Sequence, residues 1–541
     1  VTVTPVPTTA VAGSDQSTCA VAAVTLAANA PVVGTGAWTV VSGPSTNASQ
    51  FSNTASPTSS FLSDGGPGTY TLRWSISNGS CPASTDDVVI TVNACAYYSR
   101  SSGNVSDPIW SLTPGGTAGA AVWDASTNMV VQNGNTVTTT ADLQVGAITV
   151  DNGGTLILGG FNLTANGAVV DVNGTLTAND NSTLTLAGSG AKTLELAAAT
   201  SFWNLTCNTA DGTTLTGSAT IRNTLLLQDG EFDCTGNPVA LASNATRTGR
   251  LGPVGATASY TGELIVNRHI PAGATNWRML GSSVAGQTVN NLKDDFYTAG
   301  FPGSHSPNFA SPVGSGILWP SIRWYDETNT GAAVNDGLTG ATGTSQALTA
   351  GQGFAAWCGS GLTTTTAFNV DVTGAPHIAS TPIALPMSYT NTGVPATDGW
   401  NMVSNPLPSP IAFDQISRGA DVADYVTYFN PAQGNLATWD ISEGLGTNDG
   451  SNIIQSSQAF WLKATGPSVT TTVEEQDKVE GNTGGFFGGA EVQVANLVRL
   501  RVESNINQYS DETVVLFSSG QPAITSQDVP KFIFAHPDAP Q

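Results

Sequence analysis

The sequence is poor in charge, because only 10% of its 541 residues are Asp, Glu, Lys or Arg. Ordinary soluble proteins carry about 25%. The charges present are mostly acidic, 39 against 16 basic residues, and the formal net charge is −23. So few basic side chains cannot neutralise a run of phosphates, and we expect neither a nucleic-acid partner nor direct binding to an anionic membrane surface.

The sequence also lacks long apolar runs. None approaches the roughly 20 residues that a membrane-spanning helix needs, so direct membrane insertion is not expected. The first residues, VTVT, have the pattern of a strand and not of a signal peptide. We therefore expect that the chain starts after processing or belongs to a longer protein.

Histidine and the common catalytic motifs are scarce. There are four histidines, and no G-x-S-x-G or H-E-x-x-H motif. Neighbouring acidic residues on a strand point to opposite faces, so adjacent pairs do not form a glycosidase site. Between residues 123 and 245 the only basic side chains are Lys192 and Arg222, too few to bind an acidic polysaccharide. We predict that the protein is not an enzyme and needs no cofactor.

Cysteine is rare but informative. The absence of a C-x-x-C motif argues against a zinc site. Cys19 and Cys81 bracket one predicted domain, and Cys207 and Cys234 lie one or two coils apart in another. We predict a disulfide for each pair, as in proteins of oxidising compartments; the alternative is buried free thiols. The two remaining cysteines, which pair across a domain boundary or stay free, are Cys95 and Cys358.

Capped, helix-period segments are nearly absent, while short alternating segments separated by Gly, Asn, Asp and Pro occur throughout. We predict an all-β protein of tandem modules. Residues 1–95 are predicted to form an immunoglobulin-like sandwich with Trp38 and Trp74 in its core. Residues 96–122 are a connector. The opening VTV is similar to ITV at 90–92, which suggests similar modules upstream.

In residues 123–254, very short apolar segments alternate with Asn-Gly and Asp-Gly pairs. Asn-Gly favours hairpin turns, so a meandering sandwich is one interpretation. The irregular spacing and the shortness of the strands favour a parallel β-helix.

Residues 255–480 contain an internal repeat. WRMLGS at 277–282 matches WNMVSN at 400–405, IRWYD at 322–326 matches VTYFN at 426–430, and GQGF at 351–354 matches SQAF at 457–460. We predict two β-sandwich-like repeats, 255–390 and 391–480, followed by an incomplete terminal β segment at 481–541.

Two kinds of binding residue can be named. The turns at Asn335-Asp336 and Asn448-Asp449, each followed by Gly, offer oxygen ligands for calcium. The same pattern suits any tight turn. Aromatic residues of the repeats could stack on sugar rings if exposed, although core positions are the commoner fate; they are Trp319, Trp324, Tyr325 and Trp357.

The repeats resemble a module of very large secreted proteins of Bacteroidota that the type IX secretion system exports. The resemblance is carried by GWNMVSNP at 399–406, SNII at 451–454, QAFW at 458–461 and YSDET at 509–513. The first domain resembles the Ig-like or PKD-like repeats of the same proteins, through WTVVSGP at 38–44 and YTLRW at 70–74. The resemblance implies a cell-surface or released protein, such as an adhesin or a fibre component.

Together these features predict an extracellular structural or adhesive surface protein, with assembly into a filament or surface layer as one form. Expected partners are other copies of the chain, other surface proteins, glycans, and the type IX machinery during export. The alternative is a carbohydrate-binding or stalk portion of a secreted polysaccharide-degrading enzyme.

Overall fold

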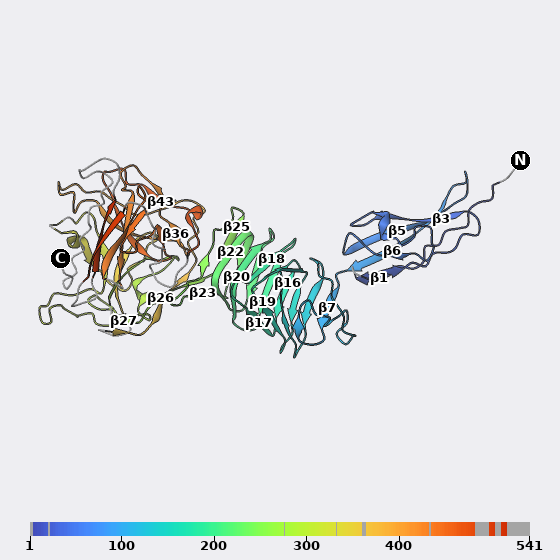
Figure 1. Cartoon of the computed structure of the whole chain (residues 1–541), viewed down its shortest axis with the longest axis horizontal. Helices are drawn as coiled ribbons and strands as arrows, with labels where there is room; N and C mark the ends of the chain where they lie inside the picture. The colour runs from blue at the N-terminus through green and yellow to red at the C-terminus, as the bar shows by residue number, and fades with distance from the viewer. Residues whose placement is uncertain are drawn as a thin grey trace. The chain divides into compact units, whose positions relative to one another are not determined.

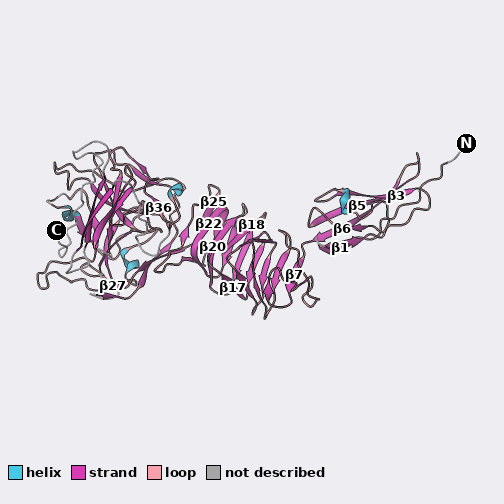
Figure 2. Cartoon of the chain, viewed as in Figure 1, coloured by secondary structure: helices cyan, strands magenta, loops and turns pink. Residues whose placement is uncertain are grey.

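The computed structural model describes residues 4–19, 22–274, 276–329, 331, 333–359, 364–431, 434–481, 497–503 and 510–516. It forms two compact units, Val1–Thr200 and Ser201–Gln541, which are considered separately. The fold is nearly all β, with 46% strand and 3% helix (Figure 1). The helices of the described residues are short 3₁₀ turns (Figure 2): η1 (Ala48–Gln50), η2 (Val289–Leu292), η3 (Val334–Gly337) and η4 (Glu475–Asp477). The predicted all-β class is confirmed.

The first unit begins with a sandwich. One sheet has the strand order β1 (Gln16–Cys19), β6 (Ser84–Asn93), β5 (Gly68–Ser77) and β3 (Thr35–Ser42), and β2 (Val24–Thr25) pairs with β4 (Ser60–Phe61). From Tyr70 to Ile76 every second residue of β5 is buried, as expected for a strand with one face on a core. Trp38 and Trp74 are a cross-strand pair with ring centroids 5.1 Å apart, so the predicted core residues are in the core.

A parallel β-solenoid follows, and it begins earlier than expected. β7 (Ala96–Ser99) pairs in parallel with β10 (Asn128–Val131), and β8 (Gly103–Asn104) pairs in parallel with β11 (Thr136–Thr138). Residues 96–122, predicted to be a connector, therefore supply the first coil, with β9 (Trp110–Ser111) antiparallel beside β7. The periodic pattern is weak here because Tyr, Trp and Pro interrupt it.

Three parallel sheets build the solenoid of the first unit. Their remaining strands are β12 (Leu143–Val145), β13 (Ile148–Val150), β14 (Thr155–Leu158), β15 (Asn162–Ala165), β16 (Val169–Val172), β17 (Thr175–Ala178), β18 (Thr183–Ala187) and β19 (Lys192–Leu196). The register places Met129, Ile148, Val170 and Leu194 in one stack, and all four are buried. The Asn-Gly pairs turn the chain from one sheet to the next, so the sequence forms coils and not hairpins.

The second unit contains the later coils, and the solenoid has about seven turns in all. Its strands are β20 (Thr200–Asn208), β21 (Thr213–Thr216), β22 (Ala219–Asp233), β23 (Val239–Leu241), β24 (Arg250–Leu251), β25 (Ala258–Thr261) and β26 (Leu264–Ile270). β26 has β23 as a parallel neighbour on one side, and the antiparallel strand β33 (Phe368–Gly374) lies on the other.

Both repeats form a sheet with the same strand order. In the first repeat the order is β28 (Asn276–Leu280), β31 (Phe354–Cys358), β29 (Ile322–Tyr325) and β30 (Leu338–Gly340). In the second it is β35 (Trp400–Ser404), β42 (Ala459–Lys463), β38 (Tyr425–Asn430), β39 (Asn435–Asp440) and β40 (Leu445–Thr447). The matched sequence segments occupy corresponding strands, so the repeat detected in the sequence is a structural duplication.

Short strand pairs complete the unit. They are β27 (Gly273–Ala274) with β32 (Thr364–Thr365), β36 (Ile411–Ala412) with β41 (Ile453–Ile454), and β43 (Thr471–Val473) between β34 (Ile383–Ala384) and β37 (Ser417–Arg418). Of the terminal segment 481–541, the structure describes a hairpin of β44 (Leu497–Glu503) and β45 (Ser510–Leu516). The first three residues and most of the terminal segment lie outside the described residues.

Buried charges join the last solenoid coil to the second repeat. The buried Lys478 ammonium lies 2.8 Å from the Glu475 carboxylate and donates to the Gly252 carbonyl at 3.1 Å. Glu475 also accepts from the Val254 amide at 2.9 Å. Removing one partner of such a buried pair leaves an uncompensated charge, so the coil and the repeat are expected to unfold together.

Candidate functional site

The two repeats pack face to face, with corresponding residues exchanged. Leu280 of β28 forms a bridge with Gln458, and Val403 of β35 forms a bridge with Gln352. In the sequence match Leu280 corresponds to Val403, and Gln352 to Gln458. Each repeat therefore offers the same two positions to the other, as in a two-fold symmetric dimer.

The backbone hydrogen bonds beside these bridges also join corresponding residues of the two repeats. The Gly281 amide donates to the Ser457 carbonyl at 2.9 Å, and the corresponding Ser404 amide donates to the Gly351 carbonyl at 2.8 Å. The symmetry breaks at Gly281, where a Cβ would clash with the Ser404 side chain. The interface has room for one side chain at this point, and the second repeat supplies it.

Tryptophans gather at one end of the first repeat's sheet. Trp277 and Trp357 are directly opposite on β28 and β31, with ring centroids 5.4 Å apart. Trp319 lies 5.5 Å from Trp277 and 5.6 Å from Trp357. The guanidinium of Arg323 is 5.2 Å from the Trp277 ring and 5.3 Å from the Trp319 ring. We call Trp277, Trp319, Trp357 and Arg323 the tryptophan cluster.

The cluster is partly open to solvent and continues into an exposed apolar loop. All three of its indoles are half-buried. Phe309 packs edge-on against Trp319 at 5.9 Å and is 41% exposed, and Ile317 in the same loop is 66% exposed. The Ala310–Leu318 bridge holds this loop together. Contiguous apolar surface of this kind marks interaction sites on soluble proteins.

The second repeat closes the corresponding surface. Trp400 takes the place of Trp277 and is 2% exposed. Lys463 takes the place of Trp357, and its Nζ lies 4.8 Å from the Trp400 ring centroid. The ammonium donates to the carbonyls of Pro395, at 2.8 Å, and of Asp398. Burial lowers the pKa of Lys463 to about 8.

The aromatic residues predicted for sugar stacking divide into two pairs. Trp319 and Trp357 are in the tryptophan cluster. Trp324 is buried against Phe354 at 5.8 Å, and Tyr325 packs edge-on against a tryptophan of the second repeat at 4.7 Å. Sequence reasoning missed Trp277, although its repeat position opposite the strand of Trp357 could have placed it there.

The turns predicted to bind calcium serve as turns in the described fold. The Asp336 carboxylate, in the turn with Asn335, accepts from the Ala333 amide at 3.0 Å. Asn448 and Asp449 have left-handed φ angles of 51° and 64°. Within the described ranges no group of three or more His, Cys, Asp or Glu is placed to hold a metal ion. Calcium binding at these turns stays a prediction.

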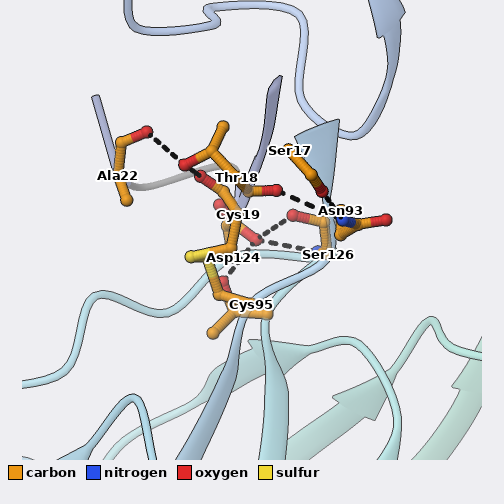
Figure 3. The surroundings of a disulfide bond; sticks show 9 residues. Ser17, Thr18, Cys19, Ala22, Asn93, Cys95, Asp124 and Ser126 are labelled. Carbon is orange, nitrogen blue, oxygen red and sulfur yellow. Dashed lines mark hydrogen bonds between the residues drawn. A yellow bond between two sulfur atoms is a disulfide. The ribbon is translucent and has the colours of Figure 1, made fainter. Parts of the chain in front are cut away.

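The disulfide predicted between Cys19 and Cys81 is wrong, because Cys19 pairs with Cys95 (Figure 3). β1 runs parallel to β6 with Cys19 opposite Asn93, which places Cys95 two residues further on. Cys81 precedes the far end of β6, about 30 Å away at 3.3 Å per residue. The Asn93 amide also donates to Ser17 at 2.9 Å, as Figure 3 shows.

The predicted Cys207–Cys234 disulfide is also wrong, because both are buried free thiols. Cys234 comes one residue after Asp233, which pairs with Thr214 of β21 and not with β20, where Cys207 lies. Its Sγ contacts the Tyr260 hydroxyl at 3.1 Å. Burial raises the pKa of the Cys207 thiol to about 12, so this thiol is unreactive. Cys358 is likewise a buried free thiol.

The structure carries no helix, within the residues it describes, that is long and apolar enough to cross a membrane. One disulfide is consistent with an extracellular protein. Comparison with known proteins gave no matching family model and no significant match to a curated protein.

Proposed function

We propose that this chain is an extracellular cell-surface protein with an adhesive role, and that the tryptophan cluster of the first repeat makes the adhesive contact. The observation that carries the proposal is the difference between the repeats. The same sheet position is closed around Trp400 and Lys463 in one copy, and left open around Trp277 and Trp357 in the other.

Energetics support a contact role for this surface. Half-buried tryptophans beside an exposed apolar loop leave apolar surface in contact with water. Burying such surface is favourable by about 25 cal/mol per Å². A partner that covers the rings recovers this free energy, and Trp and Arg dominate the binding energy of many interfaces. The Arg323 guanidinium adds a cation above the aromatic faces.

The solenoid suits the role of a spacer. Its exposed strand positions carry mainly small polar side chains, and its stacked interior is apolar. Its first strand β7 and its last strand β26 both have an antiparallel neighbour, β9 and β33. Neither of these two strands therefore presents an unpaired edge. Export by type IX secretion rests on the sequence resemblance.

The proposal is tested by labelling intact cells with an antibody against the repeats and by measuring attachment of cells that carry variants. We expect surface labelling, and a several-fold loss of attachment with Trp319→Ala. The control is Phe161→Ala, which removes an aromatic ring that is 37% exposed on the solenoid. Labelling only after permeabilisation, or equal attachment of the two variants, would contradict the proposal.

The alternative function, a carbohydrate-binding portion of a polysaccharide-degrading enzyme, is favoured by the same indoles, since sugar rings stack on exposed tryptophan. The natural open reading frame separates the two functions. A catalytic module on the same chain supports the alternative, and further β modules alone support the adhesive role.

A further inference from the structure

The first repeat has a polar cavity of about 490 Å³. One side is formed by η2 and the residues that follow it, and the other by the polar face of β33. These segments are some 80 residues apart in the sequence and come together because β33 packs beside η2. The lining residues are Gln287, Asn290, Asn291, Lys293, Asp294, Asp371 and Thr373.

Most polar side chains of the lining have no hydrogen-bond partner among the residues that the structure describes. The carboxylates of Asp294 and Asp371 accept no hydrogen bond from the residues that the structure describes. Asn291 uses its Oδ1 to accept from Thr288, at 2.9 Å, which leaves its Nδ2 protons available. The Lys293 ammonium, which also lines the cavity, donates to the Gly303 carbonyl at 2.7 Å. The cavity therefore offers mainly acceptors, and a few donors, to a ligand.

A buried acceptor adds independent evidence. Gln287 is 5% exposed, and its amide nitrogen donates to the Thr373 carbonyl at 2.6 Å and the Ala285 carbonyl at 3.2 Å. Those two bonds fix the orientation of the amide. Its Oε1 is then a buried acceptor without a partner among the described residues, and leaving such an acceptor unsatisfied is unfavourable. Gln287 lines the cavity, and a ligand hydroxyl that reached this atom would satisfy it.

The carboxyl groups also influence one another. Asp295 lies behind the lining and accepts from the Asp371 amide at 3.1 Å. Burial, with smaller contributions from the charges of Asp371 and Asp294, raises the pKa of Asp295 to about 8. Burial and Asp294 raise the pKa of Asp371 as well. An anion would be repelled, so the ligand must be neutral or cationic and rich in donors.

We propose that this cavity binds a neutral saccharide, whose hydroxyl groups donate to the Asp294 and Asp371 carboxylates and accept from the Asn291 amide. The volume lies within the roughly 300–1,000 Å³ of small-molecule sites. Carboxylates and amides together match the paired hydroxyls of a sugar, which donate and accept at once. A bound metal is the weaker interpretation, because no metal-holding group of three such residues exists in the described part of the chain. The inference goes beyond the proposed function, which places the adhesive contact at the tryptophan cluster and not at this cavity.

The test uses the full 541-residue chain on a printed array of neutral hexose and N-acetylhexosamine oligosaccharides, followed by calorimetric titration with the strongest binder. Asp294→Asn and Asp371→Asn keep the side-chain shape and remove the charged acceptor. We expect each to weaken binding at least tenfold. Glu195→Gln, which removes one charge from an exposed solenoid position, is the matched control and should bind as the native chain does.

A second variant guards against indirect effects of the charge changes. Asn290 is exposed on the rim, so Asn290→Trp should block entry and abolish binding while the thermal unfolding midpoint stays unchanged. The inference is overturned if no arrayed saccharide binds, if the Asp variants bind as tightly as Glu195→Gln, or if calcium chloride alone binds in the titration. Failure of surface labelling would instead overturn the proposed function, and saccharide binding by the purified chain would still stand.

Discussion

The two repeats share one strand order and differ in what covers the same end of the sheet. In the first, Trp357 leaves its ring half-exposed beside Trp277. In the second, Lys463 replaces that tryptophan, and its buried ammonium donates into the loop before β35. The duplicated sheets thus share a strand order, and at one corresponding position a half-exposed tryptophan of the first repeat is replaced by a buried lysine in the second.

A carboxylate of the first repeat helps to hold the segment that covers Trp400 in the second repeat. Glu327, just after β29, accepts from the Ser388 hydroxyl at 2.9 Å, from the Thr390 amide at 2.6 Å and from the Gly399 amide at 3.1 Å. These bonds hold the segment that leads into Trp400. No corresponding carboxylate of the second repeat is bonded to the loop beside Trp319 in the described residues. The asymmetry is therefore built across the interface between the repeats.

The largest expected effect compares the two corresponding tryptophans. Trp400→Ala removes a fully buried side chain and should cost about 4 kcal/mol of unfolding free energy. Trp277→Ala removes a half-buried ring and should cost about 2 kcal/mol, since part of the ring is already in water. Denaturant titration followed by circular dichroism measures both. Equal losses would mean that the two positions are equally closed, which would remove the basis of the comparison.

The next effect concerns the point where symmetry breaks. Gly281→Ser places a second side chain against Ser404, and overpacking of this kind costs about 1–3 kcal/mol. The double variant Gly281→Ser/Ser404→Gly moves the one side chain to the other repeat and should recover most of that loss. Ser404→Gly alone is the control for lost packing. Additive losses in the double variant would show that the two positions do not share one space.

The duplicated repeats and the solenoid coils could be predicted from the sequence. The matched segments predicted the duplication, because corresponding core strands need similar residues. The irregular spacing and shortness of the apolar segments favoured the coils of a parallel β-helix, although Asn-Gly pairs by themselves favour hairpins. The order of strands in the sandwich could not be read in this way. The parallel pairing of β1 with β6 brings Cys95 to Cys19, and local pattern carries no information on which strands become neighbours.

The cavity of the first repeat could not be predicted from the sequence either, because local pattern does not show which segments become neighbours. Asn290 and Asp371 look like ordinary polar residues of a turn and of an outward-facing strand position. Only the packing of β33 beside η2 brings them to one cavity. The Gln287 acceptor is likewise visible only when its two carbonyl partners are placed.

A smaller expected effect is the pH dependence that Asp295 gives to the stability of the first repeat. Because the pKa of Asp295 is raised to about 8 in the folded state, the folded state holds this proton more tightly than the unfolded chain. Stability from this group is full near pH 4 and is lost as pH rises to about 8. Asp295→Asn should remove that decline, and Glu195→Gln should retain it. Thermal midpoints between pH 4 and 9 measure both profiles, and parallel profiles would contradict the assignment.

The smallest expected effect tests whether the second repeat is closed around Lys463. Its pKa is about 8 in the folded state against an ordinary value of 10.5. Between these values the unfolded chain binds more protons, so this group makes stability rise with pH. Lys463→Met lacks the proton, and its midpoint should fall relative to the native chain between pH 8 and 10.5. A native profile parallel to that of Lys463→Met would mean that the ammonium is solvated, and the second repeat would then be as open at this position as the first.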